Sequence, residues 1–232
     1  MTSIIYPMCG RYTLVNLAQL TDLFPWITDP PIDAPARYNI APSQPILAVA
    51  NDQPDQFDFF LWGLIPAWAK DPSIGNKLAN ARAETLAEKP SFRVAFRQRR
   101  CLVLADGWYE WMPGTRGKQP YFIQQASGEP FGMAGLWESW DDRDAGERVE
   151  SCTIVTADAV PAIRHIHDRM PAVLSAPEAD RWLDPRSHDV AALDRLLAER
   201  ETQAFIARPV SRRVNDARNE GPDLVEPVDP AE

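Results

Sequence analysis

Cys9, Asn80 and His167 are residue types that together can form a nucleophilic site. A cysteine attacks carbonyl carbons as its thiolate, a histidine can carry the proton, and an amide side chain can hold the histidine in place. His165 lies near His167 and is a second candidate for the histidine, but the spacing of these residues along the chain is weak evidence that they meet. His167 could also belong to a structural turn in which Asp168 holds it. The three residues therefore form a candidate cysteine-dependent site, and other residues of the chain must support it before a function can be assigned.

The other two cysteines, Cys101 and Cys152, lie in apolar segments, whereas Cys9 lies in a polar setting beside Arg11. Buried cysteine behaves as a small apolar residue, and we expect this of Cys101 and Cys152. Three cysteines cannot all pair, and none lies in a Cys-x-x-Cys spacing, so the sequence predicts neither a zinc site nor thioredoxin-like chemistry. We expect no metal or other cofactor, and a reducing compartment, the cytoplasm.

Glu110 lies within an aromatic segment, Gly107-Trp108-Tyr109-Glu110-Trp111. Strand alternation would place Trp108 and Glu110 on one face and Tyr109 and Trp111 on the other. A carboxylate among aromatic rings is costly unless it has a partner or its pKa is raised. Glu110 is therefore either a proton carrier or a partly exposed residue at a strand end.

Composition and charge limit the classes of protein that the chain can belong to. Its 232 residues, 45% hydrophobic with eight tryptophans, are enough for one domain with a large core. A net charge of −9 argues against a protein that coats nucleic acid by bulk charge. The segment from Arg82 to Arg100, however, contains six cations and only two acids, Glu84 and Glu88. This basic segment is the part of the chain best suited to phosphates.

Hydrophobic periodicity predicts mostly β structure with a few helices. We expect strands at residues 9–14, 45–50, 57–62, 101–105, 108–111, 121–125, 131–137 and 151–156. We expect helices at residues 17–24, 176–182 and 189–200, and a loop over residues 30–45.

Two capped helices carry more specific predictions. Asn16 is expected to cap the helix at residues 17–24, and Ser91 to cap one that places Arg93, Arg97 and Arg100 on a single face. That face is either simply solvated or directed to phosphates. No signal peptide and no membrane span is expected, since no long apolar run occurs.

Several segments, taken in order, resemble one protein family. They are Met8-Cys9-Gly10-Arg11-Tyr12, Arg37-Tyr38-Asn39-Ile40-Ala41-Pro42, Trp62-Gly63-Leu64-Ile65-Pro66, Asn80-Ala81-Arg82-Ala83-Glu84-Thr85, Ala105-Asp106-Gly107-Trp108-Tyr109-Glu110-Trp111, Ile154-Val155-Thr156, His167-Asp168-Arg169-Met170-Pro171 and Pro209-Val210-Ser211-Arg212-Arg213-Val214. Together they resemble the SOS response-associated peptidase (SRAP) family of abasic-site processing proteins. The resemblance implies an α+β fold, a single domain with a central, barrel-like, mostly antiparallel β-sheet and peripheral helices.

The resemblance also implies domain boundaries, a partner and residue roles. The SRAP domain would span residues 8–218, between an extension at 1–7 and an acidic, proline-containing tail at 219–232 that is extended or disordered. The expected partner is single-stranded DNA with abasic sites, bound by a monomer. Cys9 would be the nucleophile, Asn80 would orient it, Glu110 would handle its protons and His167 would assist opening of the sugar. The residues expected to contact DNA are Arg11, Asn39, Pro42, Trp68, Arg82 and Arg169.

The chemistry of that family requires Cys9 to be N-terminal. An α-amine with a pKa near 7.7–8.0 is partly neutral at pH 7 and condenses with the aldehyde of an opened abasic sugar, whereas a lysine amine is almost wholly protonated. The thiol then closes a thiazolidine ring. Because residues 1–8 precede Cys9, either translation starts at Met8, or the extension is removed, or the extended form cannot make a thiazolidine. We favour a start at Met8, because everything that matches the family begins there. The alternatives are a cysteine peptidase, including one that removes its own extension, and a non-covalent single-stranded DNA binding module.

Overall fold

The computed structural model describes residues 9–27, 35–115, 117–142 and 146–229, and its central element is a closed five-stranded barrel. The barrel strands are β3 (Pro45–Ala50), β4 (Asp58–Trp62), β6 (Arg100–Ala105), β9 (Phe131–Asp142) and β10 (Glu147–Asp158). They follow the order β10-β4-β3-β6-β9, and β9 pairs again with β10, which closes the ring. Neighbouring strands are antiparallel except β4 and β10, which run parallel. All five were predicted as strands; the bounds of β3 match the prediction, and the other four have shifted ends.

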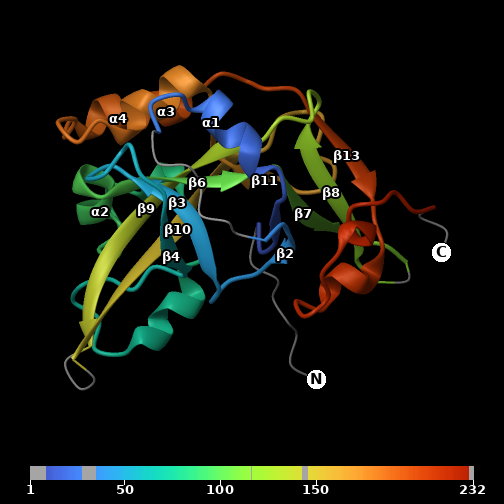
Figure 1. The fold of residues 1–232 in the computed structure, drawn as a ribbon, viewed down its shortest axis with the longest axis horizontal. Coiled ribbons are helices and arrows are strands. Elements are labelled where there is room, and N and C mark those ends of the chain that lie inside the picture. Colours follow the sequence, from blue (N-terminus) through green and yellow to red (C-terminus); the bar gives the residue numbers. More distant parts are fainter. Residues whose placement is uncertain (1–8, 28–34, 116, 143–145, 230–232) are drawn as a thin grey trace.

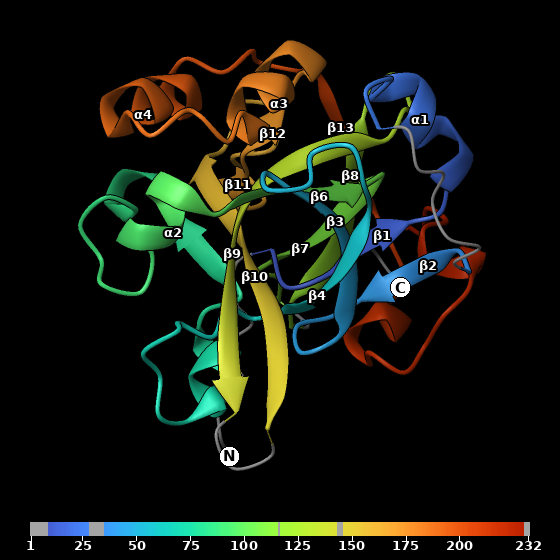
Figure 2. The same cartoon turned by 60° about the vertical axis from the view of Figure 1, so that its left-hand side comes forward.

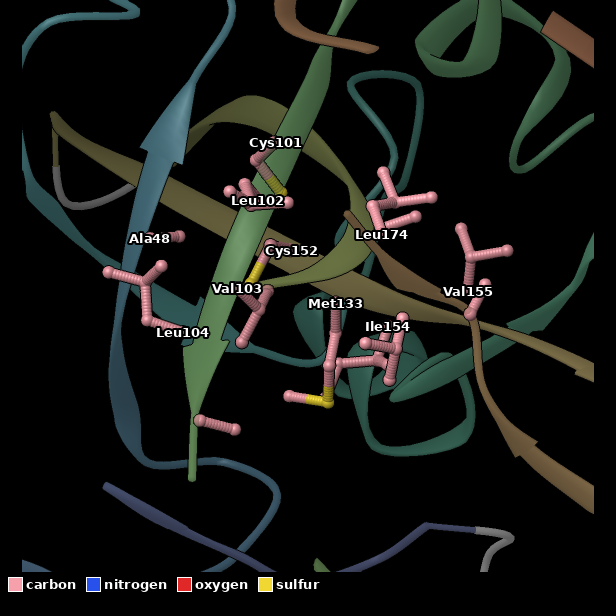
Figure 3. Packing of buried hydrophobic residues seen from close by; sticks show 14 of the residues in the cluster. Ala48, Cys101, Leu102, Val103, Leu104, Met133, Cys152, Ile154, Val155 and Leu174 are labelled. Carbon is pink, nitrogen blue, oxygen red and sulfur yellow. The ribbon is translucent and has the colours of Figure 1, made fainter. Parts of the chain in front are cut away.

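The interior of the barrel is apolar and tightly packed (Figure 3). Cys101 and Cys152 are fully buried there, as predicted for small apolar strand residues. Gly135 on β9 pairs with Cys101 on one side and Ile154 on the other, and a Cβ at that position would lie 2.7 Å from the Cys101 sulfur. Only glycine therefore fits where these strands approach one another.

A second, five-stranded sheet lies beside the barrel (Figure 1). Its order is β13-β8-β7-β1-β2, with β1 (Tyr12–Leu14), β2 (Arg37–Ile40), β7 (Gly107–Met112), β8 (Gln119–Gln125) and β13 (Phe205–Pro209). The predicted alternation on β7 is confirmed, because Trp108 packs in the main core while Tyr109 and Trp111 belong to a smaller cluster on the other face. β2 lies inside the segment predicted as a loop; residues 28–34 of that segment are outside the described ranges.

Three short strands beside the barrel were not predicted. β5 (Asn80–Arg82) runs parallel to β10, β11 (Arg169–Pro171) runs antiparallel to it, and β12 (Val173–Leu174) pairs with β9. Strands of two or three residues are too short to show a repeat of period two, so the sequence pattern could not indicate them. Two of them carry residues of the candidate site.

Short helices cover the outside of the sheets (Figure 2). They are α1 (Leu20–Leu23), α2 (Arg93–Gln98), α3 (Ala176–Leu183) and α4 (Val190–Ala198), with 3-10 turns η1 (Leu17–Gln19), η2 (Pro72–Lys77), η3 (Ala83–Thr85), η4 (Arg212–Asn215) and η5 (Pro222–Leu224). Asn16 occupies the predicted cap position, before η1, but makes no side-chain cap hydrogen bond. The cap predicted at Ser91 was wrong, because the residue that precedes α2 is Phe92. Asp189 does cap α4, accepting from the N–H groups of Ala191 and Ala192.

Arg100 corrects the prediction of a single arginine face. α2 ends at Gln98, so Arg100 is the first residue of β6 and is fully buried. Its guanidinium donates to the carbonyl oxygens of Trp182 at 2.7 Å and Asp184 at 2.8 Å. Arg93 and Arg97 stay exposed on α2, so the predicted row of three loses its last member.

The C-terminal segment was predicted to be extended or disordered, and within the described residues it packs on the domain instead. Leu224 is fully buried, Val210 forms a β-bridge with Pro227, and Glu220 accepts a hydrogen bond from the Tyr38 N–H at 2.8 Å. The fold as a whole is the predicted α+β domain. None of the helices in the described ranges is long and apolar enough to cross a membrane.

Candidate active site

Cys9 lies at the junction of the barrel and the second sheet, directly before β1. It is fully buried, and its φ of 46° is in the left-handed region that residues with a Cβ rarely adopt. Its backbone N–H donates to Oε1 of Glu110 at 3.1 Å. The backbone nitrogen of the predicted nucleophile therefore touches the predicted proton carrier, 101 residues away along the chain.

Asp106 holds β1, and with it Cys9, in this position. Its carboxylate accepts hydrogen bonds from the Thr13 hydroxyl and from the backbone N–H groups of Val15 at 2.5 Å and Asn16 at 3.0 Å. Asp106 lies in one of the motifs that resemble the family, but no role was predicted for it from the sequence. A carboxylate between two apolar strands, where a turn exposes several N–H groups, was the signal that could have identified it.

Glu110 is only 3% exposed, and burial raises its pKa to about 8. The hydrogen bond from Cys9 and the charge of Lys118 lower its pKa, whereas the nearby carboxylate of Asp168 raises it. A carboxyl that titrates close to neutral pH can both accept and return a proton. This is the raised pKa expected of a carboxyl group among aromatic rings.

Burial also raises the pKa of the Cys9 thiol well above its usual range, and the charge of Glu110 raises it further. The sulfur is therefore a thiol, not a thiolate, at neutral pH. A group that removes its proton is needed before it can react as a nucleophile. Glu110 is the buried base that contacts this residue.

Asn80 contacts the carbonyl oxygen of Cys9, whereas Glu110 contacts its backbone nitrogen. It is the first residue of β5, and its Nδ2 donates to the Cys9 carbonyl oxygen at 3.4 Å. The parallel pairing of Asn80 with Ile154 on β10 fixes its backbone. Cys9, Asn80 and Glu110 thus meet at one point, although they come from three separate segments.

His167 lies in the turn before β11, and its side chain is partly exposed. Its Nδ1 accepts a hydrogen bond from the Arg169 N–H at 3.0 Å, so a neutral ring carries its proton on Nε2. The same Nδ1 lies 3.2 Å from Oδ1 of Asp168, which would pair with it once protonated. The charge of the neighbouring Asp168 raises the pKa of Glu110.

Arg169 joins the two halves of the site. Its guanidinium bonds both carboxylate oxygens of Glu84, at 2.8 and 2.9 Å, as well as Asp158 at 2.6 Å and the Thr156 carbonyl at 2.7 Å. Glu84 follows β5, so these bonds tie the segment of Asn80 to that of His167. A phosphate contact by Arg169 would require these ion pairs to open. Glu84 was not predicted as a site residue, although it is the acid of the Asn80 motif.

The other residues expected to contact DNA fall into two groups. Arg11 and Asn39 point inward: Arg11 donates to the Val214 carbonyl at 2.7 Å, and Asn39 is fully buried and donates to three carbonyls of the C-terminal segment. Arg82 is exposed, Trp68 is 59% exposed, and Pro42 is half-buried in the turn after β2. Trp68 borders a hollow of about 550 Å³ that also contains Lys70 and Trp140.

The chain is similar to several proteins of one kind. It is 39% identical to the abasic site processing protein YoqW of Bacillus subtilis over 94% of this chain and 99% of that one. It is 35% identical to the abasic site processing protein YedK of Escherichia coli over 83% of this chain and 85% of that one. With the Gallus gallus protein HMCES, identity is 37% over 72% of this chain, which spans 56% of that longer protein.

Solved structures and sequence families agree with this likeness. A crystal structure of a protein from Bacteroides thetaiotaomicron superposes with a TM-score of 0.71 at 30% identity, covering 82% of this chain and 85% of that one. Residues 8–217 match the family described as SOS response associated peptidase (SRAP). That match includes Cys9, Asn80, Glu110 and His167. The chain belongs to the SRAP family.

Proposed function

We propose that this protein recognises abasic sites in single-stranded DNA and attaches to the ring-opened sugar through Cys9 once that residue is N-terminal. The observation that carries the proposal is the 3.1 Å hydrogen bond between the Cys9 nitrogen and buried Glu110. The relatives named abasic site processing proteins support the choice of substrate.

The first step is condensation of the free Cys9 amine with the sugar aldehyde. The protonated ring of His167, paired through Nδ1 with Asp168, can donate its Nε2 proton to the ring oxygen while the C1′ hydroxyl loses its proton to solvent, which opens the closed sugar. Glu110 accepts a proton from the amine as the carbon–nitrogen bond forms and returns it to the hydroxyl that leaves as water when the imine forms. With a pKa of about 8, Glu110 can make this exchange near neutral pH.

The second step closes the thiazolidine ring. The Cys9 sulfur adds to the imine carbon while the thiol proton moves, by way of Glu110, to the nitrogen that becomes the ring amine. Because the pKa of this thiol is raised, a base in contact with Cys9 is needed for this step. The product carries no imine, so β-elimination that would cut the strand has no starting point.

The test compares two forms of the protein on a single strand with one abasic site. Protein that begins at Cys9 should give an adduct that survives denaturing electrophoresis. Protein that retains residues 1–8, checked by intact mass, should bind the strand but give no stable adduct, since its Cys9 nitrogen is an amide. Equal adduct from both forms would rule out the amine mechanism. Binding without any adduct from either form would favour a non-covalent DNA-binding module.

A second activity, removal of the extension by Cys9 itself, is favoured by the strained φ of 46° and by the bond from Cys9 N–H to Glu110. The sulfur would attack the carbonyl carbon of residue 8 while Glu110 protonates the departing Cys9 nitrogen. The resulting thioester would be hydrolysed by water, which releases residues 1–8 and leaves a free amine. Purified full-length protein should lose the mass of residues 1–8, and Cys9→Ala should not. Equal loss from Cys9→Ala would point to another protease.

A further inference from the structure

Three cations form a row on the outside of the barrel, away from the residues that contact Cys9. They are Lys89, Arg93 and Arg97, which we call the basic column. The Arg93 N–H donates to the Lys89 carbonyl at 2.9 Å, so the turn before α2 continues into the helix. Arg93 and Arg97 are four residues apart and share one face of α2, and Lys89 stands four residues before Arg93 in the turn that leads into the helix. They extend over about 12 Å along the axis at roughly 1.5 Å per residue.

The helix beneath the basic column is rigidly held. Phe92 and Phe96 are buried on its other face, and Phe96 packs against Trp182 of α3 with ring centroids 6.0 Å apart. Figure 2 shows α2 on the flank of the barrel, with no other helix or strand over its outer side. The three cations are therefore displayed to solvent on a fixed support.

The charge of the basic column is not neutralised within the described part of the chain. All three side chains are exposed, and none takes part in the ion pairs that join other arginines to acids. Arg97 in the last turn also suits the helix dipole, but that explanation covers one residue of the three. In a protein of net charge −9, three unpaired cations in a row indicate an anionic partner.

The basic column is connected to the candidate active site by a short, tightly turned segment. Arg82 is exposed at the end of β5, two residues after Asn80. The Thr85 hydroxyl donates to the Arg82 carbonyl at 3.4 Å, and the Lys89 N–H donates to the Thr85 carbonyl at 3.1 Å. Exposed cations therefore occur at Arg82, two residues after Asn80, and again in the basic column, which ends in the last turn of α2.

We propose that the basic column binds the backbone phosphates of nucleotides that flank the abasic site on one side, after the strand has passed Arg82. The proposal rests on the proposed binding of single-stranded DNA at Cys9. A length of about 12 Å corresponds to about three or four nucleotides at 3.4 Å of rise each, which matches three phosphate contacts. Contacts of this kind add affinity without sequence preference.

The test uses the triple substitution Lys89→Gln, Arg93→Gln and Arg97→Gln, all at exposed positions. The control is Arg181→Gln, Arg195→Gln and Arg212→Gln, which removes the same charge from exposed positions elsewhere. Each protein is titrated with a long abasic single strand of about 15 nucleotides on each side and with a short one of about three, across a salt series. Covalent adduct with the short strand is measured in parallel.

The triple variant should bind the long strand about tenfold to a hundredfold more weakly at 0.1 M salt, with a salt slope smaller by about two. The short strand and the control variant should bind as in the unmodified protein. An unchanged affinity and slope on the long strand would overturn the proposal and leave an acidic protein as the partner. Equal losses in the control, or equal losses on the short strand, would also overturn it. Absence of adduct in all proteins would instead count against the proposed function, because strand binding is measured separately.

Discussion

Ionisable side chains are used in opposite ways in two regions of this protein. Inside, Glu110, Arg100 and Arg169 are buried, and each makes specific bonds to backbone or carboxylate groups. On the flank that starts at Arg82, exposed cations have no carboxylate partner among the described residues. Buried charges fix positions and tune proton transfer, whereas exposed unpaired charges are available to a partner. Substitutions in the two regions should therefore change different measurements.

The largest expected effect is on the pH dependence of stability at Glu110. The folded carboxyl keeps its proton up to about pH 8, whereas the unfolded one loses it near its ordinary value of 4.5. The folded state thus binds the extra proton in this window, and the free energy of unfolding falls as pH rises through it, by roughly 5 kcal/mol in all. Glu110→Gln should lack this fall in urea unfolding at pH 5 to 8. The same pH dependence in Glu110→Gln would show that the pKa of the Glu110 carboxyl is not raised in the folded protein.

Arg100→Met should lower the free energy of unfolding by about 3 kcal/mol, since it leaves buried carbonyl groups without donors. Arg93→Met is the matched control on the exposed flank and should change it by less than about 0.5 kcal/mol. Chemical denaturation of both variants measures the difference. Equal denaturation midpoints for the two variants would contradict the different roles assigned to the buried and the exposed arginine.

Arg169→Met should reduce the rate of adduct formation about a hundredfold, because the segments of Asn80 and His167 would no longer be tied through Glu84. Arg169→Lys keeps the charge but loses the bidentate bond, so it should recover only part of the rate. The salt dependence of strand binding should stay the same in both. A smaller salt slope would mean that Arg169 contacts a phosphate and that its ion pairs open on binding.

Arg82→Gln should have the smallest effect and one of a different kind. Loss of one phosphate contact should weaken single-strand binding about tenfold and reduce the salt slope by about 0.7, with the unfolding free energy unchanged. Titrations at several salt concentrations, with Arg195→Gln as the control, measure it. An unchanged slope would place Arg82 among the residues with a structural role only.

Much of the fold could be predicted, because the barrel strands are apolar runs long enough to show their pattern. Alternation around Glu110 also predicted which aromatic residues share its face. The short strands β5 and β11 could not be predicted, since they exist only by pairing with β10, which is distant in sequence. The prediction of a cap at Ser91 was wrong for a related reason. The helix begins at Arg93, where the packing of Phe92 and Phe96 decides its limits.

The candidate site was predicted as residue types rather than as an arrangement. Cys9, Asn80 and Glu110 could be selected from motifs, but their contact depends on a junction between two sheets that no local pattern describes. The arginines were the least predictable, because a guanidinium serves equally well inside a network of carbonyl groups or on a surface. Arg100 next to Arg97 illustrates this: one lies inside the fold and the other outside.

The most direct test is the intact mass of the product formed by protein beginning at Cys9 with an abasic single strand, followed by fragmentation to find the linked residue. We expect the combined mass less one water, linkage at Cys9, and stability without borohydride. Cys9→Ser keeps the amine but not the thiol, so it should give an adduct only when borohydride traps the imine. An untrapped adduct of equal yield from Cys9→Ser, or linkage at a lysine, would contradict thiazolidine formation at Cys9.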